Sequence, residues 1–110
     1  MLSLRAEQGG NQVGTPFTIM VTLRIDPDRM PEYLAALHEV LGPARSEPTN
    51  VFLYPHCVEE PGTIVLFERW LDNDAFFNEV LQTEHYRRYL SIAEPLYVAP
   101  REVRFLTPID

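Results

Sequence analysis

The residues best suited to chemistry gather in one short segment, ERWLDNDAFFNEVLQTEHY, at residues 68–86. Trp70, the single tryptophan of the chain, lies near its start, and His85 and Tyr86 lie at its end. An imidazole transfers protons near neutral pH, and an indole and a phenol can wall a pocket for a flat ring. We therefore expect a small aromatic-binding site, with Trp70 as a wall and His85 as proton acceptor. The alternatives are core packing for Trp70 and a local helix cap for His85.

A second set of polar and aromatic side chains alternates along residues 50–58, NVFLYPHCV. Successive side chains of a strand point to opposite faces, so Asn50, Phe52 and Tyr54 share one face. We expect Tyr54 to supply a catalytic hydroxyl, and Asn50, Phe52 and Tyr86 to contact the substrate. Pro55 indicates an edge strand or a bulge, which would reverse part of this assignment.

Glu68 lies among apolar residues, where an ionised carboxylate needs a partner or has its pKa raised. An ion pair with an arginine would satisfy it, and the candidates are Arg87, Arg88 and Arg104. We therefore predict a structural role for Glu68 in preference to a catalytic one.

Alternating strand-like and helix-like segments must position these residues. Period-two apolar patterns predict strands at residues 17–25, 50–58, 63–71 and 101–107. An apolar stripe predicts one helix over 29–41, ended by Gly42 and Pro43. A second helix is predicted from Asp72 or Asn73 to about Leu96, with a kink at Thr83. This βαββαβ order predicts an α+β, ferredoxin-like fold.

A sheet of this kind carries both helices on one face and leaves the other face uncovered. Residues 63–71 place apolar side chains on both faces, with Ile64, Leu66 and Trp70 on one and Val65, Phe67 and Leu71 on the other. Burying apolar surface stabilises an interface by about 25 cal/mol per Å². We therefore predict a homodimer with sheets packed face to face. The alternative is that loops or the N-terminal segment cover this face.

Composition narrows the classes of function. The 110 residues, 45% of them hydrophobic, predict one domain at 16–110 after a flexible lead-in at 1–15. A net charge of −7 argues against nucleic acid as a partner. We see no membrane span and no apolar signal-peptide block, so the expected location is the cytoplasm. No Cys/His cluster is evident, so no metal site is expected.

Several short elements together resemble one protein family. They are Ser46-Glu47-Pro48, then Glu68-Arg69-Trp70, then Asp72, Ala75 and Phe76, and finally Gln82-Thr83-Glu84-His85-Tyr86. In this order and spacing, over about residues 17–107, they resemble the antibiotic biosynthesis monooxygenase domain family. This family consists of dimeric α+β barrels and includes small quinol monooxygenases. The chain departs from it at Thr49, where glycine is usual, and at Glu79 or Val80, where many members have a histidine.

The resemblance implies that O₂ oxidises a quinol or a polycyclic phenol at this site without a cofactor. The catalytic residues would be His85, Trp70 and Tyr54. Haem is not expected, because residues 17–25 lack the asparagine, and the second helix before His85 lacks the histidine, of the haem-degrading branch. The missing helix histidine leaves open a non-catalytic, dimeric aromatic-ligand-binding or stress-associated module of the same fold. An isomerase or lactone-processing enzyme is a further alternative, by analogy of fold.

Overall fold

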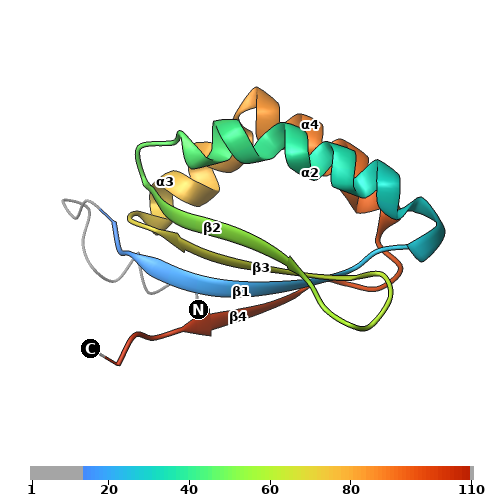
Figure 1. Cartoon of the computed structure of the whole chain (residues 1–110). Coiled ribbons are helices and arrows are strands. Elements are labelled where there is room, and N and C mark those ends of the chain that lie inside the picture. The colour runs from blue at the N-terminus through green and yellow to red at the C-terminus, as the bar shows by residue number, and fades with distance from the viewer. Residues whose placement is uncertain (1–13, 110) are drawn as a thin grey trace.

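The helices of this protein cover one face of a four-stranded antiparallel sheet (Figure 1). The computed structural model describes residues 14–109. The strands are β1 (Phe17–Arg24), β2 (Asn50–Cys57), β3 (Thr63–Trp70) and β4 (Glu102–Leu106), in the order β2-β3-β1-β4. The helices are α2 (Met30–Arg45), α3 (Asn73–Asn78) and α4 (Glu84–Ala93), with 3₁₀ turns η1 (Pro27–Arg29), η2 (Val80–Gln82) and η3 (Glu94–Leu96). The predicted α+β, ferredoxin-like fold is confirmed. The predicted lead-in, residues 1–15, lies outside the described residues except for Gly14 and Thr15.

β1 is an inner strand of the sheet and pairs with both β3 and β4. Its helix-facing side chains, Phe17, Ile19, Val21 and Leu23, are at most 8% exposed. Opposite them on β3 lie, in the same order, Trp70, Glu68, Leu66 and Ile64. The predicted alternation therefore places Glu68 and Trp70 beneath the helices, on the same side of the sheet.

The β2–β3 hairpin turns at Gly62, as the sequence predicts. Gly62 has φ +79°, and the Thr63 amide donates to the Glu60 carbonyl at 3.2 Å. A Cβ at Gly62 would collide with the backbone oxygen of Ile25, so the position requires glycine on two grounds. The Ile25 amide in turn donates to the Gly62 carbonyl at 2.7 Å, which fastens the hairpin to the end of β1.

The prediction that Gly42 and Pro43 end the first helix is wrong, because α2 continues to Arg45. Pro43 removes one backbone donor near the end of the helix, but tertiary contacts hold the last turn in place. Ala44 is fully buried, and the Arg45 guanidinium donates twice to the Leu53 carbonyl on β2, at 2.8 and 3.1 Å. These contacts outweigh the local helix-breaking signal.

The second helix is divided, as the sequence predicts. The Asp72 carboxylate caps α3 by accepting from the Ala75 amide at 3.0 Å. The chain then passes through η2, and α4 begins after Thr83, whose hydroxyl donates to the Val80 carbonyl at 2.6 Å. This break lets α4 present Tyr86 and Tyr89 to the sheet, where both are buried.

No described helix covers the other face of the sheet (Figure 1). Aromatic rings lie on this face. Phe52 stacks on Tyr54 with ring centroids 5.1 Å apart and contacts Phe67 at 4.8 Å. Tyr54 is 51% exposed. Among residues 14–109, no helix is long and apolar enough to cross a membrane.

Candidate functional site

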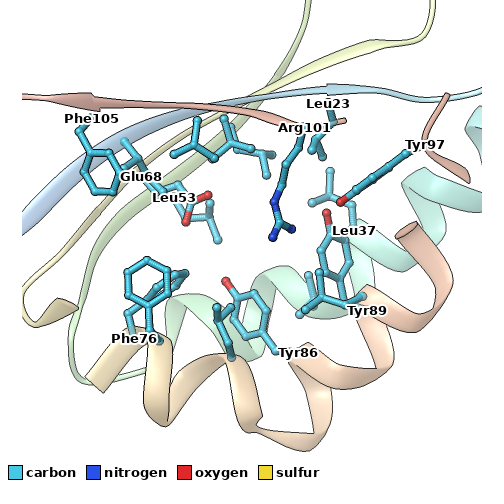
Figure 2. Close-up of a pocket in the computed structure, with 18 residues that line it drawn as sticks. Leu23, Leu37, Leu53, Glu68, Phe76, Tyr86, Tyr89, Tyr97, Arg101 and Phe105 are labelled. Carbon is cyan, nitrogen blue, oxygen red and sulfur yellow. The ribbon is translucent and has the colours of Figure 1, made fainter. Parts of the chain in front are cut away.

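A cavity of about 160 Å³ lies between the sheet and the helices that cover it (Figure 2). Its walls are mainly apolar and include Leu53, Leu66, Phe76, Phe77, Leu81 and Phe105. Val103 and Phe105 on the edge strand β4 also line it and remain 44% and 45% exposed. This edge of the sheet is therefore the entrance to the cavity.

Glu68 is the one carboxylate among the described residues that line the cavity. Its side chain is only 6% exposed, and one carboxylate oxygen accepts a 2.9 Å hydrogen bond from the Trp70 indole N–H. Burial raises the pKa of the Glu68 carboxyl, and the Trp70 hydrogen bond acts in the opposite direction. A carboxyl with a raised pKa beside an apolar cavity is suited to accepting a proton from a bound ligand.

The predicted ion pair between Glu68 and an arginine is wrong. Arg88 is exposed on α4 and binds Glu39 at 2.7 Å. Arg87 is exposed as well. Arg104 lies opposite Met20 in the register of β1 and β4, so its side chain is on the side of the sheet away from Glu68. The carboxylate faces the core layer, whereas all three guanidinium groups lie on other surfaces.

Tyrosine hydroxyls supply further polar groups of this layer. The Tyr86 hydroxyl points into the cavity (Figure 2), and its pKa is raised first by burial and then by the nearby Glu68 charge. The Tyr33 and Tyr89 hydroxyls share a 2.8 Å hydrogen bond, and burial raises the pKa of both. These hydroxyls therefore remain protonated hydrogen-bond donors at neutral pH.

Of the sequence-predicted site residues, Tyr86 lines the cavity and Trp70 lies just behind its wall. Trp70 is fully buried, packs against Phe76 with ring centroids 4.6 Å apart and binds Glu68. The sequence predicts the indole as a pocket wall, with core packing as the alternative. Its N–H donates to the Glu68 carboxylate, and Trp70 does not itself line the cavity. It contacts the lining residues Glu68 and Phe76 from behind.

The structure does not bring the remaining predicted residues into the cavity. The His85 imidazole lies in a surface groove between α2 and α4, with Nε2 3.3 Å from the Glu47 carboxylate and 3.2 Å from the Thr83 hydroxyl. Phe52 and Tyr54 stack on the uncovered face of the sheet. The Asn50 amide donates to the Phe52 carbonyl at 3.2 Å.

A bulge at the start of β2 explains part of this difference. The register shifts between Asn50 and Phe52, so these residues do not alternate as in a regular strand. Leu53 is the β2 residue that reaches the cavity. Sequence reasoning also missed Tyr89, Arg101 and Phe105 as cavity residues. Of the cavity residues that were not predicted as site residues, only Glu68 could have been identified from the sequence, because it lies two positions before Trp70 on the same face.

Comparisons with known proteins agree with this architecture. The sequence model of the family described as antibiotic biosynthesis monooxygenase matches residues 16–91. A protein of Pestalotiopsis microspora named "Putative monooxygenase GME11364" is 26% identical over 88 residues, which are 78% of this chain and 73% of that protein.

Solved structures give the same result. Rv0793 from Mycobacterium tuberculosis is 26% identical and superposes with a TM-score of 0.77, over 87% of this chain and 97% of its own. The "putative antibiotic biosynthesis monooxygenase" of Caulobacter crescentus shares the fold, with a TM-score of 0.79 at 14% identity, over 89% of this chain and 93% of its own. With its family match, its fold and its motifs in agreement, this chain belongs to the antibiotic biosynthesis monooxygenase family.

Proposed function

We propose that this protein is a cofactor-independent monooxygenase that uses O₂ to oxidise a small quinol or phenol. The observation that carries the proposal is the buried Glu68 carboxyl at the edge of an aromatic-walled cavity. An electron-rich hydroquinone can itself reduce oxygen once it is deprotonated. The protein then has to hold the ring, accept a proton and keep water away from the intermediates.

The size of the cavity favours a single ring over a polycyclic phenol. Its volume is about 160 Å³. An engineered protein cavity of about 150 Å³ holds one benzene molecule. Further fused rings would have to protrude past Val103 and Phe105 at the entrance. We therefore narrow the expected substrate to a monocyclic quinol, or a larger one whose additional ring lies in the entrance.

In the proposed reaction, Glu68 accepts the proton of a substrate hydroxyl. The deprotonated ring transfers one electron to O₂, and the ring radical and superoxide combine to form a peroxide at a ring carbon. Loss of water from this peroxide leaves a hydroxyquinone. One hydroquinone and one O₂ give one hydroxyquinone and one water, so the substrate supplies all the electrons.

Two neighbouring residues support this chemistry. The Trp70 N–H holds one Glu68 oxygen at 2.9 Å, which fixes the carboxyl while its other oxygen serves the substrate. The Tyr86 hydroxyl points into the cavity and can donate to the oxygen on which negative charge develops (Figure 2). Glu68 would return its proton to the peroxide oxygen that leaves as water.

Oxygen consumption with a panel of hydroquinones tests the proposal. The panel should extend from benzohydroquinone to naphthohydroquinones and anthrones, with a chelator present and no flavin added. We expect one O₂ consumed per molecule of quinone product formed, and the fastest turnover with the smallest rings. Tight binding of these ligands without oxygen uptake above background would instead favour the non-catalytic binding module.

We further propose a homodimer formed through the uncovered face of the sheet. Phe52, Tyr54 and Phe67 form a contiguous aromatic surface there, opposite the helices. Burying such apolar surface stabilises an interface by about 25 cal/mol per Å². This interface would leave the cavity, which lies on the helical side, free to bind substrate.

A further inference from the structure

Arg101 brings a positive charge into the cavity. It immediately precedes β4, and its side chain extends between the sheet and the helices, with the guanidinium group in the cavity beside Tyr97 (Figure 2). Of the described residues that line the cavity, Arg101 alone is a cation and Glu68 alone is an acid. The cavity is therefore apolar along its walls and has one basic and one acidic side chain, the first just before β4 and the second on β3.

The protein itself pairs Arg101 poorly. Its nearest carboxylate, Glu94, lies 3.9 Å away, and both side chains are about half exposed. The Arg88–Glu39 ion pair, by comparison, spans 2.7 Å. Burial raises the pKa of Tyr97, and the charge and hydrogen bond of Arg101 act in the opposite direction. A planar guanidinium with a weak partner retains N–H donors that a ligand carboxylate can fill.

The separation of Arg101 from Glu68 suits one substituted ring. Glu68 lies opposite Ile19, while β4 pairs Val103 with Val21 and Glu102 with Thr22. Arg101 therefore falls near the level of Leu23, and the strand rise places the two levels about 13 Å apart along the sheet. The two side chains project into the space between them (Figure 2). The cavity volume of about 160 Å³ leaves room for about one ring.

We propose that the cavity selects aromatic acids, binding a ligand carboxylate at Arg101 while a ring hydroxyl meets Glu68. The substrate class would then be dihydroxybenzoates and similar hydroquinones that carry an anionic group. That dihydroxybenzoates are substrates depends on the proposed monooxygenase function. The preference for binding aromatic acids does not depend on it.

Binding of two matched, non-quinol probes tests the inference without turnover. 4-Hydroxybenzoate and 4-hydroxybenzamide have nearly the same shape, but only the first carries a charge. Isothermal titration calorimetry of the full chain should show the acid binding roughly tenfold more tightly than the amide. R101Q should remove this preference, and R101K should retain part of it because the charge remains. R88Q is the matched control, since Arg88 lies on the surface and should leave the ratio unchanged.

Equal affinity of wild type for both probes, failure of both to bind, or a preference that survives in R101Q would overturn the inference. Oxygen uptake with 2,5-dihydroxybenzoate and with unsubstituted hydroquinone separates it from the proposed function. Selective binding of the acid without any oxygen uptake would leave the Arg101 site standing and reject the monooxygenase. Oxidation of hydroquinone at least as fast as that of 2,5-dihydroxybenzoate, with no tighter binding of the acid, would support the monooxygenase and reject the Arg101 site.

Discussion

Replacing Glu68 with glutamine tests the proposed reaction at the atom that accepts the proton. E68Q preserves the size of the side chain and keeps a carbonyl oxygen for the 2.9 Å hydrogen bond from Trp70. It removes the ability to accept a proton. Positioned acid–base groups contribute about 10²–10⁴-fold to rate. That range corresponds to about 2.7–5.4 kcal/mol of transition-state stabilisation. We expect kcat of oxygen uptake to fall by this factor, with little change in substrate binding.

The same substitution should stabilise the protein at high pH. Burial raises the folded-state pKa of Glu68 above the ordinary carboxyl value of 4.5, so the folded protein holds the proton more tightly than the unfolded chain. The stability that Glu68 contributes is fully present below the ordinary pKa of 4.5. It is lost as the pH rises through the folded-state pKa. Each pKa unit of the shift corresponds to about 1.36 kcal/mol. E68Q should therefore exceed wild type in stability above the folded-state pKa and match it in acid.

Urea unfolding at a fixed protein concentration, repeated from about pH 4 to about pH 9, measures this difference. E39Q is a suitable control, because Glu39 is 55% exposed and its ion pair lies outside the cavity. Its effect on stability should stay within about 1 kcal/mol at every pH. Near-normal kcat in E68Q would refute Glu68 as the proton acceptor. Lower stability of E68Q at high pH would refute the burial argument.

Four further substitutions test other parts of the structure. H85A should keep at least half of the wild-type oxygen uptake, because His85 binds Glu47 outside the cavity; a loss comparable to that of E68Q would restore His85 as the base. Y33F and Y89F should each cost about 1–3 kcal/mol in urea unfolding by leaving a buried hydroxyl unpaired. The double variant should cost less than the sum, and strict additivity would mean that the 2.8 Å bond contributes nothing. F67E should convert a dimer to a folded monomer in light scattering with unchanged circular dichroism, and a monomeric wild type would contradict the proposed interface.

Much of the fold could be predicted because its signals are local. The alternation along residues 17–25 and 63–71 assigns side chains to sheet faces without knowledge of the rest of the chain. Asp72 and Gly62 act through their own backbone geometry, as a helix cap and a left-handed turn residue. Pro43 shows the limit of this reasoning. Its local signal to end the helix is overridden by the burial of the adjacent Ala44, which depends on the packed structure.

The candidate site was less predictable because its residues depend on tertiary placement. Glu68 and Trp70 could be assigned to one face, but the hydrogen bond between them depends on the side-chain conformations. The bulge in β2 breaks the alternation on which the assignment of Asn50 depended. The position of His85 in the helix was foreseen, whereas the groove it faces is fixed only by the packing of α4 against α2. Arg101 precedes its strand and has no periodic pattern to reveal it.

The edge strand β4 has a consequence for how this chain can diversify. Val103 and Phe105 border the ligand space but stay nearly half solvent-accessible, so little folding energy depends on them. The β1 and β3 side chains beneath the helices, by contrast, are buried in the hydrophobic core, where truncation is costly. Substitutions at Val103 and Phe105 can therefore change the width or the charge of the cavity entrance with little effect on the folding free energy. The residues that would select the ligand are therefore different from the residues that stabilise the fold.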